Sequence, residues 1–151
     1  MTQPLEERLA GRGRRLVATL IDMLLVPMLT ALLIMIAGVM EHAEAYRNST
    51  WMLNVFLLAV LSYLILNGYW LFTRGQTIGK RAMGVAIVTT ASGERAAFWK
   101  LVCIRALFFP LLFTVISPML ALLPIADQGF VFRKNRRCLH DLAAGTSVVR
   151  V

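Results

Sequence analysis

Three long apolar runs constrain this chain more than any other feature of its sequence. They cover residues 16–40, 51–73 and 106–126. Each reaches the roughly 20 residues that a helix needs to cross a hydrocarbon core of about 30 Å. With 58% hydrophobic residues in 151 and a mean hydropathy of +0.69, the chain is too apolar for an ordinary soluble domain. We therefore expect an integral membrane protein.

Basic residues beside the runs predict the orientation in the membrane. Four arginines precede the first run, whereas the loop after it, EHAEAYRNST, holds one arginine against two glutamates. The positive-inside rule then makes the N-terminus cytoplasmic and this loop external. The loop 74–100 is again basic and is expected to be cytoplasmic. The expected location is the bacterial plasma (inner) membrane. The net charge of +8 comes from basic residues that flank the apolar runs, a placement that fits the positive-inside rule better than nucleic-acid binding.

The third run conflicts with a single crossing. The tail 127–151 is basic, so one crossing would place it outside, against the rule. The run also contains Pro110, Pro118 and Pro124, and each proline removes a backbone hydrogen bond from a helix. A bent or re-entrant hairpin would return the tail to the cytoplasm. We favour the hairpin, and a single crossing stays the alternative.

Two short segments have the pattern of strands. Val85, Ile87 and Thr89 are β-branched and precede a turn signal at Gly93, and the chain ends in GTSVVRV. Isolated strands need partners, so pairing would require both on one side of the membrane. The predicted fold is an all-α membrane protein with a short cytoplasmic β element. Its single domain, 1–151, has two full transmembrane helices and a third, proline-broken transmembrane or re-entrant segment, with spans at about 16–40, 51–73 and 101–126.

One acidic residue, Asp22, lies inside the first run. An ionised aspartate at the centre of a membrane helix costs about 2.5–3.5 kcal/mol, so a partner must compensate. Arg15 shares its helix face, but seven residues rise about 10 Å, which makes a direct pair improbable. Counting depth along the runs places other polar residues nearer to this level. We predict a polar cluster of Asp22, Asn67, Tyr63 and Arg105.

The predicted cluster has two interpretations of equal weight. Interhelical polar contacts often only hold helices together. Alternatively, an intramembrane acid binds a cation or a proton in a conduction path. Pairing of Asp22 across a homo-oligomer interface is compatible with either.

Two other motifs have simpler explanations than a catalytic or binding site. TRGQTIGKR has the glycines and lysine of a phosphate loop but neither its spacing nor the following Ser or Thr. Its glycines are expected to shape a turn out of the membrane, and its cations to meet anionic headgroups. His140 and Asp141 lack a nucleophile at any recognisable spacing, and with His42 predicted on the other side, no Cys or His cluster supports a metal site. Asp141 should instead meet basic residues or cap a helical turn.

The stretches RRLVATLID, GQTIGKRAMGVAIVTTASGE and RRCLHDLAAGTSVV, in this order, resemble the RDD family of small membrane proteins, named for one arginine and two aspartates. The resemblance covers about residues 13–151. It implies that Arg15, with Arg14 as the alternative, is the family arginine and that Asp22 and Asp141 are the aspartates. The family's function is uncertain, with transport proposed. An ion pair between Arg15 and Asp141 would dock the tail under the helices.

We therefore carry two functional hypotheses. The first is ion or small-solute transport with Asp22 as the cation or proton site. Because three apolar segments can hardly enclose a path, transport predicts a homo-oligomer or a partner membrane subunit. The second is a non-transporting membrane scaffold or assembly subunit that recruits partners. Under either, we expect contacts with membrane lipids, including anionic headgroups, and no nucleic acid, catalytic residue, metal or cofactor.

Overall fold

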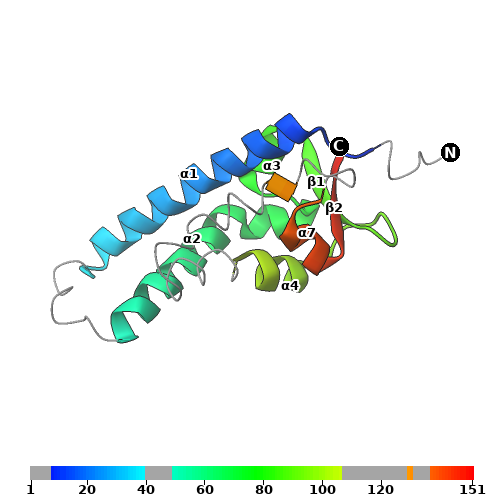
Figure 1. Cartoon of the computed structure of the whole chain (residues 1–151). Helices are drawn as coiled ribbons and strands as arrows, with labels where there is room; N and C mark the ends of the chain where they lie inside the picture. Colours follow the sequence, from blue (N-terminus) through cyan, green and yellow to red (C-terminus); the bar gives the residue numbers. More distant parts are fainter. Residues whose placement is uncertain (1–7, 40–48, 107–128, 131–136) are drawn as a thin grey trace.

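A computed structural model of the protein describes residues 8–39, 49–106, 129–130 and 137–151. Two long helices run side by side, and the short helices and the strands gather at one end of the pair (Figure 1). The start of the first helix and the end of the chain meet at that end. The described part is mostly helical.

The long helices are α1 (Arg12–Ile36) and α2 (Ser49–Arg74). Both are long and apolar enough to cross a membrane. Their outward faces expose large apolar side chains, as expected for contact with lipid; these include Leu20, Leu24, Met28, Leu32, Leu53, Leu57, Leu61 and Ile65. α1 begins four residues before the predicted span and ends before residue 40, because residues 37–39 form a turn.

The third predicted span is described only at its start. It begins with α4 (Phe98–Leu101), which continues into the π-helix η1 (Val102–Ala106). Residues 107–128, with all three prolines of the run, lie outside the described residues. The choice between a hairpin and a single crossing therefore stays a prediction.

Strands β1 (Val85–Thr89) and β2 (Thr146–Arg150) form a two-stranded antiparallel sheet. Val85 pairs with Arg150 and Thr89 with Thr146. The helix α7 (Leu139–Ala144) leads into β2 through Gly145, whose φ of 63° is the left-handed conformation typical of a glycine that ends a helix. The side of the membrane on which the sheet lies stays a prediction.

A small apolar core joins this sheet to the helices. It is formed by Ala10, Leu71, Val85, Ile87, Ala96, Leu101 and Val148. Because these residues come from the N-terminal segment, α2, both strands, α4 and the loop before α4, the core ties the ends of the chain to the end of α2. The remaining element, α3 (Ile78–Ala82), lies between α2 and β1 in the sequence and packs mainly against α1.

Candidate functional site

The site is built where α3 packs on α1. Gly79 sits so close to α1 that a Cβ atom there would overlap the carbonyl oxygen of Ala18 and come within 3.0 Å of Asp22 Cγ. Only glycine allows such an approach of two backbones. Of the two glycines in GQTIGKR, Gly75 follows the end of α2 with a φ of 63°, as expected for a turn, whereas Gly79 allows α3 to pack against α1 beside Asp22.

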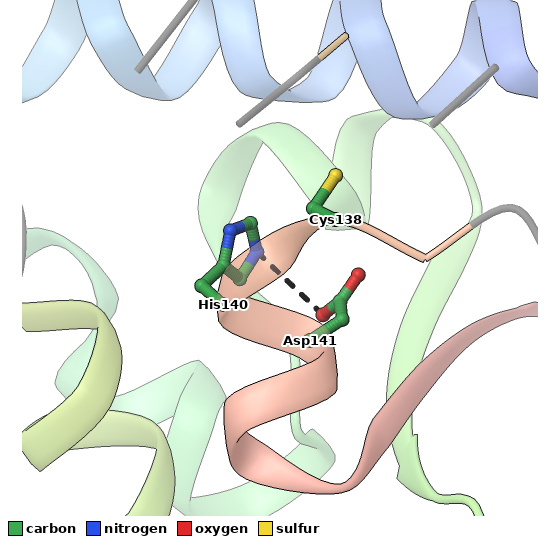
Figure 2. Close-up of side chains that lie close together, drawn as sticks. All are labelled: Cys138, His140 and Asp141. Carbon is green, nitrogen blue, oxygen red and sulfur yellow. Dashed lines mark ion pairs between the residues drawn. The ribbon is translucent and has the colours of Figure 1, made fainter. Parts of the chain in front are cut away.

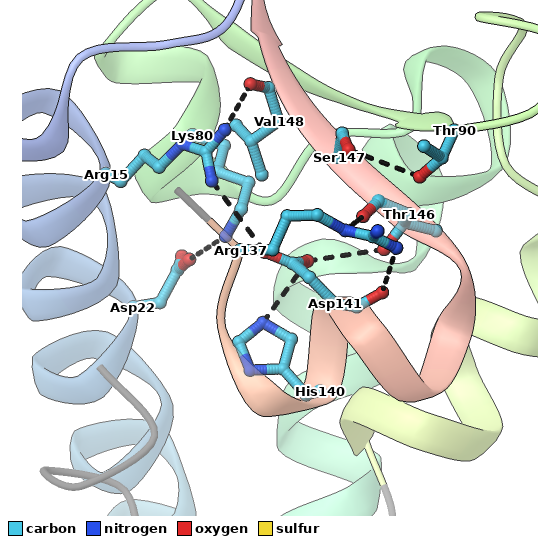
Figure 3. A network of polar contacts seen from close by, with 10 residues as sticks. All are labelled: Arg15, Asp22, Lys80, Thr90, Arg137, His140, Asp141, Thr146, Ser147 and Val148. Carbon is cyan, nitrogen blue, oxygen red and sulfur yellow. Dashed lines mark hydrogen bonds and ion pairs between the residues drawn. The ribbon is translucent and has the colours of Figure 1, made fainter. Parts of the chain in front are cut away.

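Asp22 finds its partners in α3. The hydroxyl of Thr77 donates to Asp22 Oδ2 at 2.5 Å, and the backbone N–H of Gly79 donates to Oδ1 at 2.9 Å. The ammonium of Lys80 lies 4.0 Å from Oδ2, with the two side chains 9% and 16% exposed (Figure 3). Two hydrogen-bond donors and a cation therefore surround this carboxyl group. They compensate the acid that the first apolar run contains.

Asn67, from α2, binds the start of the same short helix, α3. It is 1% exposed, and its Oδ1 accepts the N–H of Ile78 at 2.8 Å. The N–H of Lys80 donates to the hydroxyl of Thr77 at 3.3 Å. The first N–H groups of a helix have no partner within it. Here three consecutive ones are satisfied by Asn67 of α2, Asp22 of α1 and the N-cap Thr77.

The four residues of the predicted cluster thus have different surroundings. Asp22 and Asn67 come together by binding adjacent amides of α3. Tyr63, one turn before Asn67 on α2, is partly buried and packs against the apolar core. Arg105 lies in η1, and its side chain is outside the described part of the structure. Its membership of the cluster stays a prediction.

Lys80 corrects one expectation. The basic residues of GQTIGKR were expected at the headgroups, yet Lys80 is 8% exposed because the docking of α3 turns it towards Asp22. Arg81, the next residue along the helix, is exposed, and its guanidinium lies 3.5 Å from the centre of the Trp70 ring. Arg74, 5.4 Å from the same ring, is exposed as well. For these two arginines, contact with lipid headgroups stays a prediction.

Arg15 and Asp141 form a second polar centre, which ties α1 to the C-terminal elements. Both are buried, at 4% and 1% exposure, and Arg15 Nη1 lies 3.9 Å from Asp141 Oδ2. Arg15 Nη2 donates to the carbonyl oxygen of Val148 at 2.6 Å, and the hydroxyl of Thr146 donates to Asp141 Oδ1 at 3.3 Å. Asp141 meets a basic residue, as one of the two expectations held; it lies in the first turn of α7, whose N-cap residue is Cys138.

The C-terminal segment also gathers potential ligands. Figure 2 shows Cys138, His140 and Asp141 side by side on the first turn of α7. One ligand atom of each lies within 4.8 Å of the others, and all three residues are buried. The expectation that the sequence has no Cys or His cluster was wrong, because one turn of helix suffices to bring these residues together. His42 lies outside the described residues.

A comparison with protein families gives a match to the RDD family over residues 9–145. This range covers nearly the whole chain and includes both polar centres. The family resemblance expected from the three sequence stretches is confirmed. Comparisons with curated proteins and with solved structures found no match.

Proposed function

The chain belongs to the RDD family of membrane proteins, and from this premise we propose that it transports a small cation or a proton, with Asp22 as the exchange site. The observation that carries the proposal is the ion pair between Asp22 and Lys80, at 4.0 Å. Asp22 lies in α1, which is long enough to span a membrane. An ionisable residue in such a helix is by default a candidate functional site, above all when its partner is known.

The geometry leaves Asp22 able to exchange its partner. A carboxylate offers about four lone-pair positions, and the short hydrogen bonds from Thr77 and Gly79 occupy two of them. Lys80 is held less closely, and its ammonium is a point charge on a flexible stem. A proton or a cation that reaches Asp22 would therefore replace Lys80 without undocking α3.

Transport also requires more surface than one chain provides. Two candidate spans are found among the described residues, and even with the third predicted run, three apolar segments can hardly enclose a path. We propose that a second copy or a partner membrane subunit packs on the exposed apolar faces of α1 and α2. We place the sheet and α3 on the cytoplasmic side of the bacterial plasma membrane, because α1 begins and α2 ends with arginines near the sheet.

A second candidate function is a membrane scaffold or assembly subunit. It is favoured by a specific observation: Asp22, Asn67 and Thr77 each satisfy one N–H of the first turn of α3. These polar residues then have a role in fixing the fold that needs no transported ion. The cation partner of Asp22 would serve only to neutralise it.

Flux measurements on purified protein in liposomes separate the two functions. We would compare the wild type with Asp22→Asn, which keeps an oxygen for the Gly79 N–H but loses the charge, and with Lys80→Gln. Arg14→Gln is the matched control, since Arg14 is an exposed cation on α1. Incorporation and oligomeric state are matched for all four proteins.

Transport predicts cation- or proton-driven flux that is lost in Asp22→Asn and unchanged in Arg14→Gln. In Lys80→Gln, flux should saturate at a lower cation concentration, because the internal competitor is gone. Flux that persists in Asp22→Asn would remove Asp22 from the transport site. No flux from the wild type with Na⁺, K⁺ or a pH gradient would leave the scaffold as the better function.

A further inference from the structure

We propose that Cys138, His140 and Asp141 form a binding site for a borderline-soft divalent cation such as Zn²⁺. The three ligand atoms lie within 4.8 Å of one another and all three residues are buried (Figure 2). The inference concerns a different part of the chain from the Asp22 site. It does not depend on the proposed transport.

The spacing of the ligand atoms fits one metal ion after a small adjustment. Tetrahedral Zn²⁺ with bonds of about 2.0–2.3 Å to nitrogen, oxygen and sulfur holds its ligand atoms about 3.3–3.6 Å apart. His140 Nε2 already lies 3.5 Å from Asp141 Oδ1. The ligand atom of Cys138 lies within 4.8 Å of the other two. A rotation of the Cys138 side chain that shortens these distances by about 1 Å would bring all three atoms to the spacing of a tetrahedral site.

The donor set selects the class of cation. A thiolate, an imidazole and a carboxylate together suit Zn²⁺ and Co²⁺, whereas Mg²⁺ and Ca²⁺ prefer oxygen ligands alone. Three protein ligands leave a fourth position of a tetrahedral ion for water or another donor. The site is therefore expected to exchange its metal more readily than a site closed by four protein ligands.

Neighbouring groups already orient the carboxylate in the way that metal sites require. The hydroxyl of Thr146 donates to Asp141 Oδ1 at 3.3 Å, and Arg15 faces the other oxygen, Oδ2, at 3.9 Å. Such outer contacts fix the direction of a metal-bound carboxylate. The positive charge of Arg15 also repels a metal cation bound nearby, so we expect a moderate affinity for the metal.

Metal binding changes the protonation and the charge of the site. The Cys138 thiol gives its proton to solvent, and the thiolate and the Asp141 carboxylate supply two negative charges against the divalent cation and Arg15. One net positive charge is left at the site. Because a proton leaves, affinity should rise with pH. The metal would then hold the first turn of α7 rigid beside α1, at the contact between the C-terminal segment and the spans.

Cobalt titration of the purified full chain in detergent tests the site. We expect one Co²⁺ per chain, with a thiolate-to-cobalt absorption band that Zn²⁺ abolishes by displacement. Cys138→Ser should remove the band. Cys103→Ser, which changes the exposed second cysteine, is the matched control and should keep it.

His140→Asn separates loss of metal binding from loss of folding. It keeps a polar side chain of similar size and leaves the Cys138 thiol in place, so the variant is expected to fold. It should weaken Co²⁺ binding at least tenfold while the unfolding temperature without metal stays near that of the wild type. A wild type without the thiolate band, or a band that survives Cys138→Ser, would overturn the site. Neither result bears on flux through Asp22.

Discussion

Gly79→Ala tests whether the close docking of α3 on α1 supports the fold. In a helix, alanine is favoured over glycine by about 1 kcal/mol, so propensity alone predicts that the variant is more stable. The structure predicts the opposite sign, because the added Cβ would overlap the carbonyl oxygen of Ala18 and approach Asp22 Cγ to 3.0 Å. Both neighbours are anchored to α1, so α3 has to move away.

The size of the loss follows from the contacts that α3 makes. Moving α3 lengthens the bonds from Thr77 and Gly79 to Asp22, and hydrogen bonds to a charged group contribute about 1.5–3 kcal/mol each. Separating a buried carboxylate from its cation costs about 3–5 kcal/mol when one partner is lost. Part of this free-energy loss is offset because lipid headgroups or water can bind Asp22, whose side chain is 16% exposed. We expect a net loss of about 2–4 kcal/mol in the free energy of unfolding.

The assay is reversible unfolding in mixed micelles, with helix content and tryptophan fluorescence as signals. Gly68→Ala is the matched control, because Gly68 lies inside α2 and a Cβ there meets nothing within 4 Å. Gly68→Ala should be neutral or stabilise by up to about 1 kcal/mol. A Gly79→Ala protein as stable as Gly68→Ala would refute the docking of α3 against Asp22.

Two further predictions concern the C-terminal segment. Arg15→Met should destabilise the protein by about 3–5 kcal/mol, because it leaves the buried carboxylate of Asp141 without its cation; the double variant with Asp141→Leu should be more stable than Arg15→Met in the same unfolding assay, and additive losses would contradict the pairing. Fusion of a fluorescent protein after Val151 should give fluorescent cells, whereas a periplasm-active phosphatase fused at the same place should be inactive, because the basic tail is predicted to be cytoplasmic. The reverse pattern would mean that the third apolar run crosses once.

The sequence was sufficient for the features that depend on local pattern. The two long apolar helices follow from apolar runs of the length that a bilayer needs, and the contact of Arg15 with Asp141 was expected once the family motifs were placed. The bounds of α1 were less accurate, since its first turn begins among arginines that hydropathy assigns to the loop. Lys80 was misplaced for a related reason: a basic residue beside a span is normally exposed, and only the three-dimensional docking of α3 makes it an exception.

Asp22 shows what a linear sequence leaves undetermined. Counting depth along the runs indicated Asn67 as a neighbour of Asp22, and both side chains bind the start of α3. The element that joins them is a helix of only five residues. One local signal was available: threonine is a favoured N-cap, and Thr77 precedes Gly79, a residue that permits close approach of two backbones. Read together, they indicate a short helix pressed against a neighbour.

This arrangement bears on why the chain keeps an acid in a helix long enough to span a membrane. If Asp22 only neutralised Lys80, replacing both by apolar residues would remove two buried charges and often stabilise a protein. The hydrogen bonds to Thr77 and Gly79 mean that such a replacement would also strip two partners from the first turn of α3. The variant Asp22→Asn with Lys80→Gln removes the charges, keeps an acceptor oxygen for the Gly79 N–H and offers the Thr77 hydroxyl an amide donor in place of the second acceptor. If it folds as stably as the wild type, the charges are not needed for the fold, and loss of flux in it would assign them to transport.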